Sequence, residues 1–529
     1  MKKILLLFLI VFSKTLIAQT LDPAAIKLFR FGEIQKEKPA VEYPDGTRLD
    51  VTAFGEDYNE KFFETDGVNR LQNWLIQNAT KCPKVGTNER FASCVARPSK
   101  IVGIGLNYAA HAAEAKQPIP NEPVLFLKAT TSLSGANDNI PIPKGSVKLD
   151  YEAEIAIIIG KKATYVSETE AMNYVAGFAV ANDVSERNFQ LERTGQWTKG
   201  KSHDGFCPLG PYLVTKESVG DPQNLKIWLT VNGQKRQDAN TSDMIFNIKQ
   251  LVSRVSQFMT LLPGDVIVTG TPSGVAIASG RYLQEGDIVE LGIEKLGTQK
   301  QKVISFIQSQ LTEAEYKEYQ AWIALGVGGL PHTLEGFRSV QNMNKMLKDG
   351  TDWKRIEPYI GEKGDVSSLK NLPQRKGSKP NIAPFAVPHR QTDQHNTTDI
   401  RDVQSKIFDD QVANSKGQLI YKNSYLEIHN PGIFLKDSAS GNPTIVPISH
   451  AEIGHIHKFD GSMHLILSPS DTKEVILKGW GELHGLAAAG TRAAKTYMMI
   501  YSPRDQKELK ITTQILEAAV KYQTFVPKN

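Results

Sequence analysis

Residues 149–160 read Leu-Asp-Tyr-Glu-Ala-Glu-Ile-Ala-Ile-Ile-Ile-Gly, and the β-branched apolar run in the second half predicts a buried strand. Glu152 and Glu154 lie at the start of this run, and residues two apart on a strand point to the same face. Two adjacent carboxylates are costly to bury unless a cation lies between them, and a divalent metal with oxygen ligands would serve. An exposed strand end with two solvated glutamates is the alternative, and this stretch alone does not decide between them.

A third carboxylate favours the metal. Ser167 and Glu170 have the spacing of a capping box, which predicts a short helix after Ser167. Residues 175–182 then predict a second buried strand that ends at Asp183. A strand–helix–strand unit would bring this aspartate to the two glutamates. Three carboxylates with room for water suit Mg²⁺ or Mn²⁺ better than Zn²⁺, which prefers cysteine and histidine.

Five short motifs occur in order along the first half of the chain. They are Gly-Leu-Asn-Tyr-Ala-Ala-His-Ala-Ala-Glu at 105–114, Asp-Tyr-Glu-Ala-Glu at 150–154, Ala-Asn-Asp-Val-Ser at 181–185, Gly-Lys-Ser at 200–202 and Thr-Gly-Thr-Pro-Ser-Gly-Val at 269–275. Each motif is weak alone, but the ordered set resembles the fumarylacetoacetate hydrolase family over about residues 28–307. The resemblance implies a β-rich α+β fold, namely a mixed β-sandwich roll with a small N-terminal subdomain.

His111 and Glu114 lie three residues apart in an alanine-rich segment that favours a helical turn, so they can touch. A carboxylate beside an imidazole fixes its tautomer and raises its basicity, which suits a general base that activates water. An isolated pair of this kind is more often a surface ion pair. The resemblance implies instead that His111 and Glu114 are a water-activating dyad.

The resemblance also implies roles for residues outside this pair. The implied ligands of Mg²⁺ or Mn²⁺ are Glu152, Glu154 and Asp183. Lys201 is the implied active-site lysine, which could stabilise developing negative charge. Thr271 lies in a loop that offers N–H and hydroxyl groups to a small anion, and the resemblance places it against the substrate carboxylate. Gln237 is the second implied substrate-binding residue.

The activity that the resemblance implies is metal-dependent hydrolysis of a C–C bond in a small 2,4-dioxo acid of the acylpyruvate type, by a homodimer. Residues 196–211 are most similar to the branch that acts on sugar-derived 2,4-dioxo acids and on ureidoglycolate. A ureidoglycolate lyase, or a decarboxylase or isomerase on the same metal site, stays open. A periplasmic small-molecule binding protein is the alternative of a different class, and the complete set of carboxylates, dyad and lysine argues against it.

The composition indicates a folded protein of more than one domain, since the chain has 529 residues, 40% of them hydrophobic and 22% charged. A net charge of +5 without a dense basic stripe argues against nucleic-acid binding. Lys2 and Lys3, an apolar run at 4–12 and a small-residue site near Ala18 predict a cleaved signal peptide, and therefore a periplasmic or secreted protein. That run is too short to span a membrane, and no later run is long enough.

Cysteine pairing stays open at this point. In an oxidising compartment Cys82 and Cys94 could form a disulfide, and two free thiols are an equal alternative. Cys207 would remain unpaired in either case.

The second half of the chain predicts a separate domain. A helix over 312–325 leaves the first domain, and a glycine-rich break follows it. The expected parts are a signal peptide at 1–19, an N-terminal subdomain at 20–100, a catalytic domain at 101–307 and a second α+β domain at 312–527.

Histidines concentrate in this second domain. His455 and His457 share a face of a predicted strand, as paired metal ligands often do, and His464 and His484 follow within thirty residues. A second metal or ligand site and a polar, hydrogen-bonded sheet surface both fit the pattern. The region resembles a luciferase-like domain of unknown function, a resemblance that implies neither light emission nor any catalytic residue.

Overall fold

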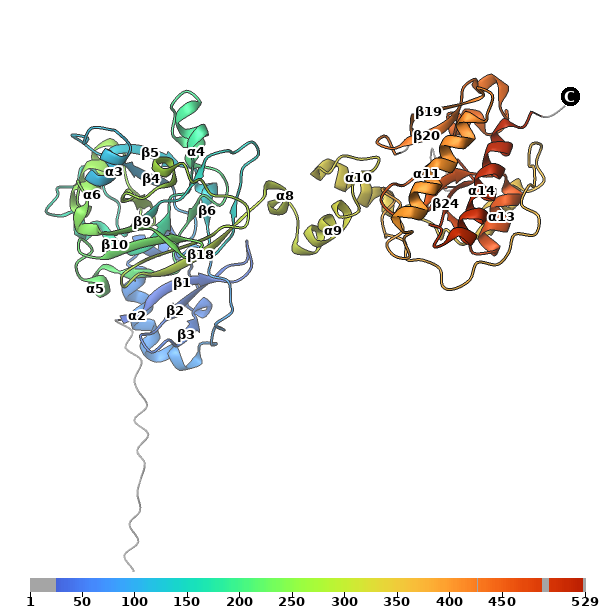
Figure 1. The fold of residues 1–529 in the computed structure, drawn as a ribbon. Coiled ribbons are helices and arrows are strands. Elements are labelled where there is room, and N and C mark those ends of the chain that lie inside the picture. The colour runs from blue at the N-terminus through green and yellow to red at the C-terminus, as the bar shows by residue number, and fades with distance from the viewer. Residues whose placement is uncertain (1–24, 426, 488–493, 527–529) are drawn as a thin grey trace, which may run out of the picture. The chain divides into compact units, whose positions relative to one another are not determined.

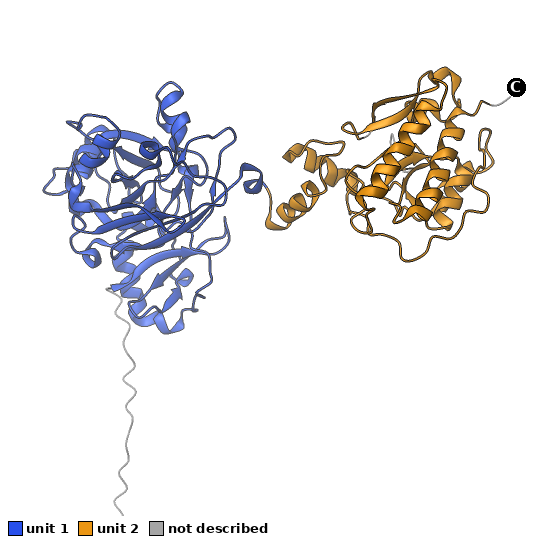
Figure 2. Ribbon diagram, viewed as in Figure 1, with its two compact units in different colours: residues 1–310 blue, residues 311–529 orange. Residues whose placement is uncertain are grey.

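The computed structural model describes residues 25–425, 427–487 and 494–526. The chain forms two compact units that divide between Gln310 and Leu311, between the predicted domain ends at 307 and 312 (Figures 1 and 2). The predicted signal peptide and its cleavage site lie outside the described residues. Within the described ranges, no helix combines the length and the apolar character needed to cross a bilayer.

Unit 1 is rich in strands. Its strands are β1 (Lys27–Phe31), β2 (Lys38–Glu42), β3 (Arg48–Asp50), β4 (Ile101–Gly105), β5 (Val124–Lys128), β6 (Leu133–Ser134), β7 (Ile140–Pro141), β8 (Leu149–Asp150), β9 (Ala153–Ile159), β10 (Val175–Asn182), β11 (Ser185–Glu186), β12 (Cys207–Pro208), β13 (Leu213–Thr215), β14 (Lys226–Val231), β15 (Gln234–Asn240), β16 (Val266–Val268), β17 (Ile288–Ile293) and β18 (Gly297–Ile304). Its helices are α1 (Glu60–Glu64), α2 (Gly67–Asn78), α3 (Ala109–Glu114), α4 (Thr198–Lys201), α5 (Lys216–Val219), α6 (Ile248–Phe258), α7 (Ala276–Ser279) and α8 (Phe306–Ser309).

Two sheets organise unit 1. The larger has nine strands in the order β3-β2-β1-β13-β10-β9-β16-β4-β5, and the smaller has five in the order β15-β14-β17-β18-β7. The larger sheet is mixed, since β16 runs parallel to β4 and antiparallel to β9. Because β1 pairs with β13, the strands of the N-terminal segment extend this sheet and do not form one of their own.

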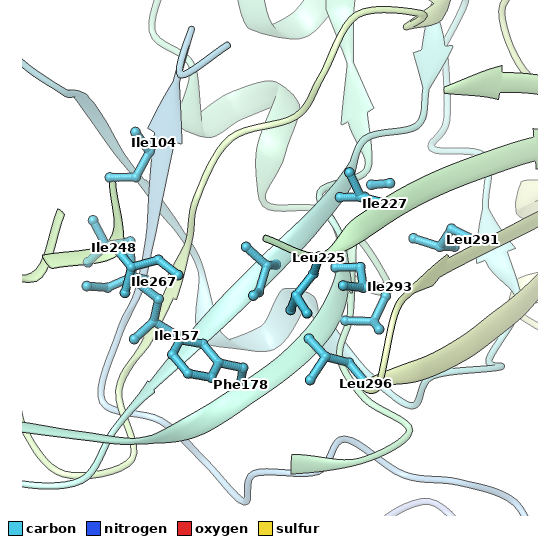
Figure 3. Close-up of a cluster of buried hydrophobic side chains, with 14 of the residues drawn as sticks. Ile104, Ile157, Phe178, Leu225, Ile227, Ile248, Ile267, Leu291, Ile293 and Leu296 are labelled. Atoms are coloured by element: carbon cyan, nitrogen blue, oxygen red, sulfur yellow. The ribbon is translucent and has the colours of Figure 1, made fainter. Parts of the chain in front are cut away.

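Both faces of strand β9 are buried, which shows that this strand lies in the core of unit 1. Ile155 and Ile157 belong to one apolar cluster, while Ala156 and Ile158 belong to another, as the alternation of a strand requires. Figure 3 shows Ile157 in the first cluster with side chains from both sheets. The labelled neighbours include Phe178 and Ile267 from the larger sheet and Ile227, Leu291 and Ile293 from the smaller one.

The structure confirms most of the local predictions for this region. The strand predicted at 149–160 is present as β8 and β9, and the strand at 175–182 is β10. The short helix expected after Ser167 is only a 3-10 turn at Ala171–Tyr174, and the Ser167 hydroxyl donates to the Glu170 carboxylate at 3.0 Å, so the predicted capping box is not formed. All three cysteines are free thiols, so the Cys82–Cys94 disulfide is not formed.

Unit 2 has a sheet of its own. Its strands are β19 (Leu419–Asn423), β20 (Pro431–Leu435), β21 (Glu452–Ile456), β22 (Met463–Ile466), β23 (Gly481–Leu483) and β24 (Tyr497–Ile500), in the order β19-β20-β21-β22-β24-β23. Its helices are α9 (Glu313–Ile323), α10 (Leu334–Asn344), α11 (Thr398–Ala413), α12 (Val446–Ser449), α13 (Pro469–Leu477) and α14 (Gln506–Thr524). The helix predicted at 312–325 is α9, and Thr312 caps it through a capping box with Glu315. The predicted α+β class is therefore confirmed for both units.

Candidate active site

The three predicted carboxylates meet where β9 begins and β10 ends. Antiparallel pairing sets Ala181 opposite Glu154, and the Asp183 N–H donates to the Glu152 carbonyl at 2.9 Å. One carboxylate oxygen from each of Glu152, Glu154 and Asp183 lies within 4.8 Å of the other two. All three side chains are buried. Strand pairing therefore assembles the acidic cluster that the two-residue spacing suggests.

Three cations surround this cluster. Lys201 Nζ donates to Glu152 Oε2 at 2.6 Å and to Asp183 Oδ2 at 2.7 Å, which puts the predicted lysine among the carboxylates. Lys128 Nζ donates to Asp183 Oδ1 at 2.5 Å. Arg187 Nη2 donates to Glu152 Oε1, also at 2.5 Å.

Two of these three cations, Lys128 and Arg187, were not predicted from the sequence. Arg187 follows Asp183 by four residues and lies two residues beyond the third family motif, so extending that motif could have found it. Lys128 is a single lysine at the end of a strand, and no sequence pattern distinguishes it from a solvated one.

The charges are unevenly matched within the cluster. Burial, reinforced by the negative charges of Asp183 and Glu152, raises the pKa of Glu154 well above its ordinary value. Burial acts the same way on Glu152, but the charges of Arg187 and Lys201 outweigh it and lower the Glu152 pKa. Glu154 Oε2 accepts a hydrogen bond from the uncharged Gly270 N–H, at 2.7 Å. The negative charge around Glu154 is thus the least compensated in the cluster.

This donor set fits a hard divalent cation. Carboxylate oxygens are the ligands that Mg²⁺ and Mn²⁺ prefer, and the three oxygens are close enough to share one ion. A dication beside Glu154 would also offset the repulsion that raises the pKa of this carboxyl. Glu152, Glu154 and Asp183 are therefore the residues that would hold the metal.

The predicted dyad is positioned by helix α3 and by the loop that contains Gly274. His111 and Glu114 lie on α3, and His111 Nδ1 is 3.4 Å from Glu114 Oε2. Both carboxylate oxygens of Glu114 accept the Gly274 N–H, at 3.0 and 3.1 Å. Gly274 has a φ of +105°, and a Cβ at this position would lie 1.9 Å from the Arg236 carbonyl oxygen. The approach of this loop to the dyad therefore requires glycine.

Thr271 and Gln237 occupy different places relative to the cavity. Thr271 lines it and donates to the Ala153 carbonyl at 2.9 Å. Gln237 is fully buried, and its amide donates to Thr271 Oγ1 and to the Pro272 carbonyl, both at 2.8 Å. It also accepts the Ala153 N–H at 2.9 Å. Gln237 thus anchors the Thr271 loop from the buried side of that loop, and its contact with substrate stays a prediction.

A cavity of about 520 Å³ lies beside the carboxylates and the His111–Glu114 pair. Its polar lining includes His111, Glu114, Glu152, Glu154, Lys201 and Thr271. Its apolar lining includes Ile104, Leu106, Phe126, Leu191, Trp197 and Ile277. The rings of Phe126 and Trp197 pack with centroids 5.5 Å apart. Glu152, Glu154, the His111–Glu114 pair, Lys201 and the apolar side chains therefore line one cavity, whereas Asp183 lies behind the lining residues.

Residues 100–304 match the family model described as fumarylacetoacetate hydrolase C-terminal. Over 279 residues the chain is 48% identical to a protein of Burkholderia multivorans named "Putative hydrolase", and the match covers 52% of this chain and 98% of the relative. This chain belongs to the fumarylacetoacetate hydrolase family. Residues 450–519, in unit 2, match a model described as a luciferase domain. Unit 1 is thus an enzyme of this family, and a second domain follows it in the same chain.

Solved structures of the family resemble the chain over about half of its length. A fumarylacetoacetate hydrolase from Exiguobacterium antarcticum is 33% identical and covers 53% of this chain and 100% of its own, with a TM-score of 0.47. A maleylpyruvate hydrolase from Sphingobium sp. SYK-6, solved with manganese(II) and pyruvate, is 29% identical over 53% of this chain and 99% of its own, with a TM-score of 0.45. A 2-hydroxyhepta-2,4-diene-1,7-dioate isomerase from Mycobacterium marinum is 31% identical over 53% and 99%, with a TM-score of 0.42.

Proposed function

We propose that unit 1 is a metal-dependent hydrolase that cleaves a C–C bond in a small 2,4-dioxo acid. The observation that carries this proposal is that the His111–Glu114 pair lines the same cavity as Glu152, Glu154 and Lys201. Hydrolysis requires a base beside the attacking water, whereas a binding protein does not. A lyase, a decarboxylase or an isomerase on the same carboxylates would have less need of the pair.

We assign one Mg²⁺ or Mn²⁺ ion to Glu152, Glu154 and Asp183. When bound, the ion would act as a Lewis acid for the substrate oxygens and orient the substrate in the cavity. The Thr271 loop would bind the substrate carboxylate through its N–H groups, since the Thr271 hydroxyl already donates to the Ala153 carbonyl. Lys201 then balances charge within the cluster.

The proton transfers follow from the orientation of the imidazole. His111 Nδ1 faces Glu114, so Nε2 is the nitrogen that takes a proton from water. The resulting hydroxide oxygen bonds to the distal carbonyl carbon, and Glu114 stabilises the imidazolium. Lys201 stabilises the negative charge that develops on oxygen. The C–C bond then breaks towards the 2-oxo acid fragment, which takes the proton back from His111, so one water yields a carboxylic acid and a pyruvate-type acid.

The apolar wall indicates what the distal part of the substrate is. Phe126, Leu191 and Trp197 line the cavity with aromatic and aliphatic carbon. Burying an apolar group against them is favourable, and burying an unpaired charge there is costly. We therefore propose an acylpyruvate whose acyl group is aliphatic or aromatic.

A substrate screen tests this function. Purified full-length protein is incubated with Mg²⁺ or Mn²⁺ and with a series of 2,4-dioxo acids that carry apolar or carboxylated acyl groups, and with ureidoglycolate. We expect release of pyruvate from the apolar acylpyruvates, abolished by chelator and restored by metal. Turnover of ureidoglycolate alone would replace the hydrolase by the lyase, and binding of these acids without any turnover would indicate a binding protein.

A further inference from the structure

Unit 2 buries a cluster of histidines. Strands β21 and β22 pair with His455 opposite His464, and His457 follows directly after β21. Glu427 approaches from the segment before β20. One ligand atom from each of Glu427, His455, His457 and His464 lies within 4.8 Å of the other three, and all four residues are buried.

Hydrogen bonds orient two of the imidazoles. His455 Nδ1 donates to Glu452 Oε1 at 2.7 Å. His457 Nδ1 donates to Ser462 Oγ at 2.8 Å, since that hydroxyl donates in turn to Asp460 Oδ1. With the protons on Nδ1, both rings keep a lone pair on Nε2, which is the arrangement of metal-bound histidines with an outer carboxylate or hydroxyl.

The carboxylate is oriented in the same way. Glu427 Oε2 accepts from Arg390 Nη2 at 3.0 Å. Its other oxygen, Oε1, lies 3.6 Å from His457 Nε2. His457 Nε2 is buried and has no hydrogen-bond partner in the part of the chain that the structure describes. A buried nitrogen lone pair beside a carboxylate oxygen is unfavourable unless a cation or a proton bridges them.

A network of hydrogen-bonded histidines explains only half of the cluster. His464 Nδ1 lies 3.3 Å from His455 Nε2, and His464 Nε2 lies 3.2 Å from His389 Nδ1, so protons can bridge these three rings. The 3.6 Å contact between His457 and Glu427 is too long for a hydrogen bond, and the hydrogen bonds among the other three rings do not stabilise it. Something else must account for this half.

The spacing fits a metal ion. Ligands about 2.1 Å from a tetrahedral centre lie about 3.4 Å from one another. The observed separations are 3.3 Å between His455 and His464 and 3.6 Å between His457 and Glu427. Three imidazoles and one carboxylate suit the later first-row transition metals, whereas Mg²⁺ and Ca²⁺ prefer oxygen ligands throughout.

We propose that unit 2 binds one first-row transition-metal dication through His455 Nε2, His457 Nε2, His464 Nδ1 and Glu427 Oε1. On binding, the proton of His464 moves from Nδ1 to Nε2 and that of His389 from Nδ1 to its own Nε2, so the bridge between the two rings is kept with its direction reversed. His484, the fourth histidine expected at this site, is left out of the set. Its Nδ1 accepts the Leu486 N–H at 3.1 Å.

The stoichiometry of bound cobalt distinguishes this site from the carboxylate site of unit 1. The full-length protein is stripped with chelator, reloaded with Co²⁺ and analysed by metal content and visible absorption. In a Glu154→Gln background, which weakens the unit 1 site, we expect about one equivalent of cobalt with the strong bands of a tetrahedral nitrogen-rich centre. Adding His457→Gln should remove both the cobalt and the bands.

The matched control is His450→Gln, because His450 is an exposed histidine of the same unit, stacked on Tyr425. It should keep the cobalt and the spectrum. If His457→Gln does not fold, Glu427→Gln keeps the side-chain shape and should weaken cobalt binding at least about tenfold. A Glu154→Gln protein that binds no cobalt, or a folded His457→Gln or Glu427→Gln variant that binds it unchanged, would overturn the proposal.

Discussion

Replacing Glu114 by Gln tests the base without disturbing the loop that holds it. Glutamine keeps an acceptor oxygen for the Gly274 N–H, so the position of α3 is retained. What is lost is the attraction between the carboxylate and the imidazolium that forms 3.4 Å away. Two unit charges at this distance attract by about 1–5 kcal/mol for an effective dielectric constant of about 80–20. Because the Glu114 side chain is 22% exposed, we take about 2 kcal/mol, or about 30-fold in kcat.

Steady-state kinetics on the best acylpyruvate of the screen measure this effect. We expect Glu114→Gln to lower kcat about 30-fold with little change in KM, and His111→Ala to lower it about 10²–10⁴-fold. The double variant should be little worse than His111→Ala, since the two residues work as one unit. Glu122→Gln, an exposed glutamate near the same helix, is the matched control. A folded Glu114→Gln enzyme within about twofold of wild type would refute the role of the dyad.

Three further predictions concern the metal site of unit 1, the Gly274 loop and the cellular localisation. Glu154→Gln should lose bound Mg²⁺ or Mn²⁺ and most of its activity, and metal analysis that finds full occupancy would contradict the ligand set. Gly274→Ala should lower kcat and destabilise the protein by about 1–3 kcal/mol, because its Cβ meets the Arg236 carbonyl. Gly280→Ala is its control, since that glycine also has a positive φ but open space, and equal losses in both would refute the steric argument. We propose export of the chain with cleavage near Ala18 or Gln19, so mass spectrometry of protein from the native cell should find an N-terminus near residue 19 or 20, and an intact Met1 in the cytoplasmic fraction would exclude it.

The sequence predicted those parts of the site that depend on local spacing. The two-residue interval between Glu152 and Glu154 sets both on one strand end, and β-branched runs mark β9 and β10. Partners brought in by pairing over long distances could not be predicted in this way. Lys128 reaches Asp183 across 55 residues, and the parallel pairing of β16 with β4 has no local signature.

The histidine cluster shows the same division between local and distant contacts. His455 and His457 were recognisable from strand alternation, because they lie two residues apart. Glu427 and His389 come from distant segments, and only the fold brings them to the same rings. The sequence also could not reveal that the Leu486 N–H occupies Nδ1 of His484.

Hydrolysis in water enriched in ¹⁸O tests the central claim most directly. The metal-loaded enzyme is incubated with its best acylpyruvate in H₂¹⁸O, and the products are weighed by mass spectrometry against substrate kept in the same water without enzyme. The proposed mechanism predicts pyruvate together with a carboxylic acid that carries one heavy oxygen beyond the control, and no reaction after chelation. Loss of CO₂, or a product with the mass of the substrate, would contradict hydrolysis at the distal carbonyl.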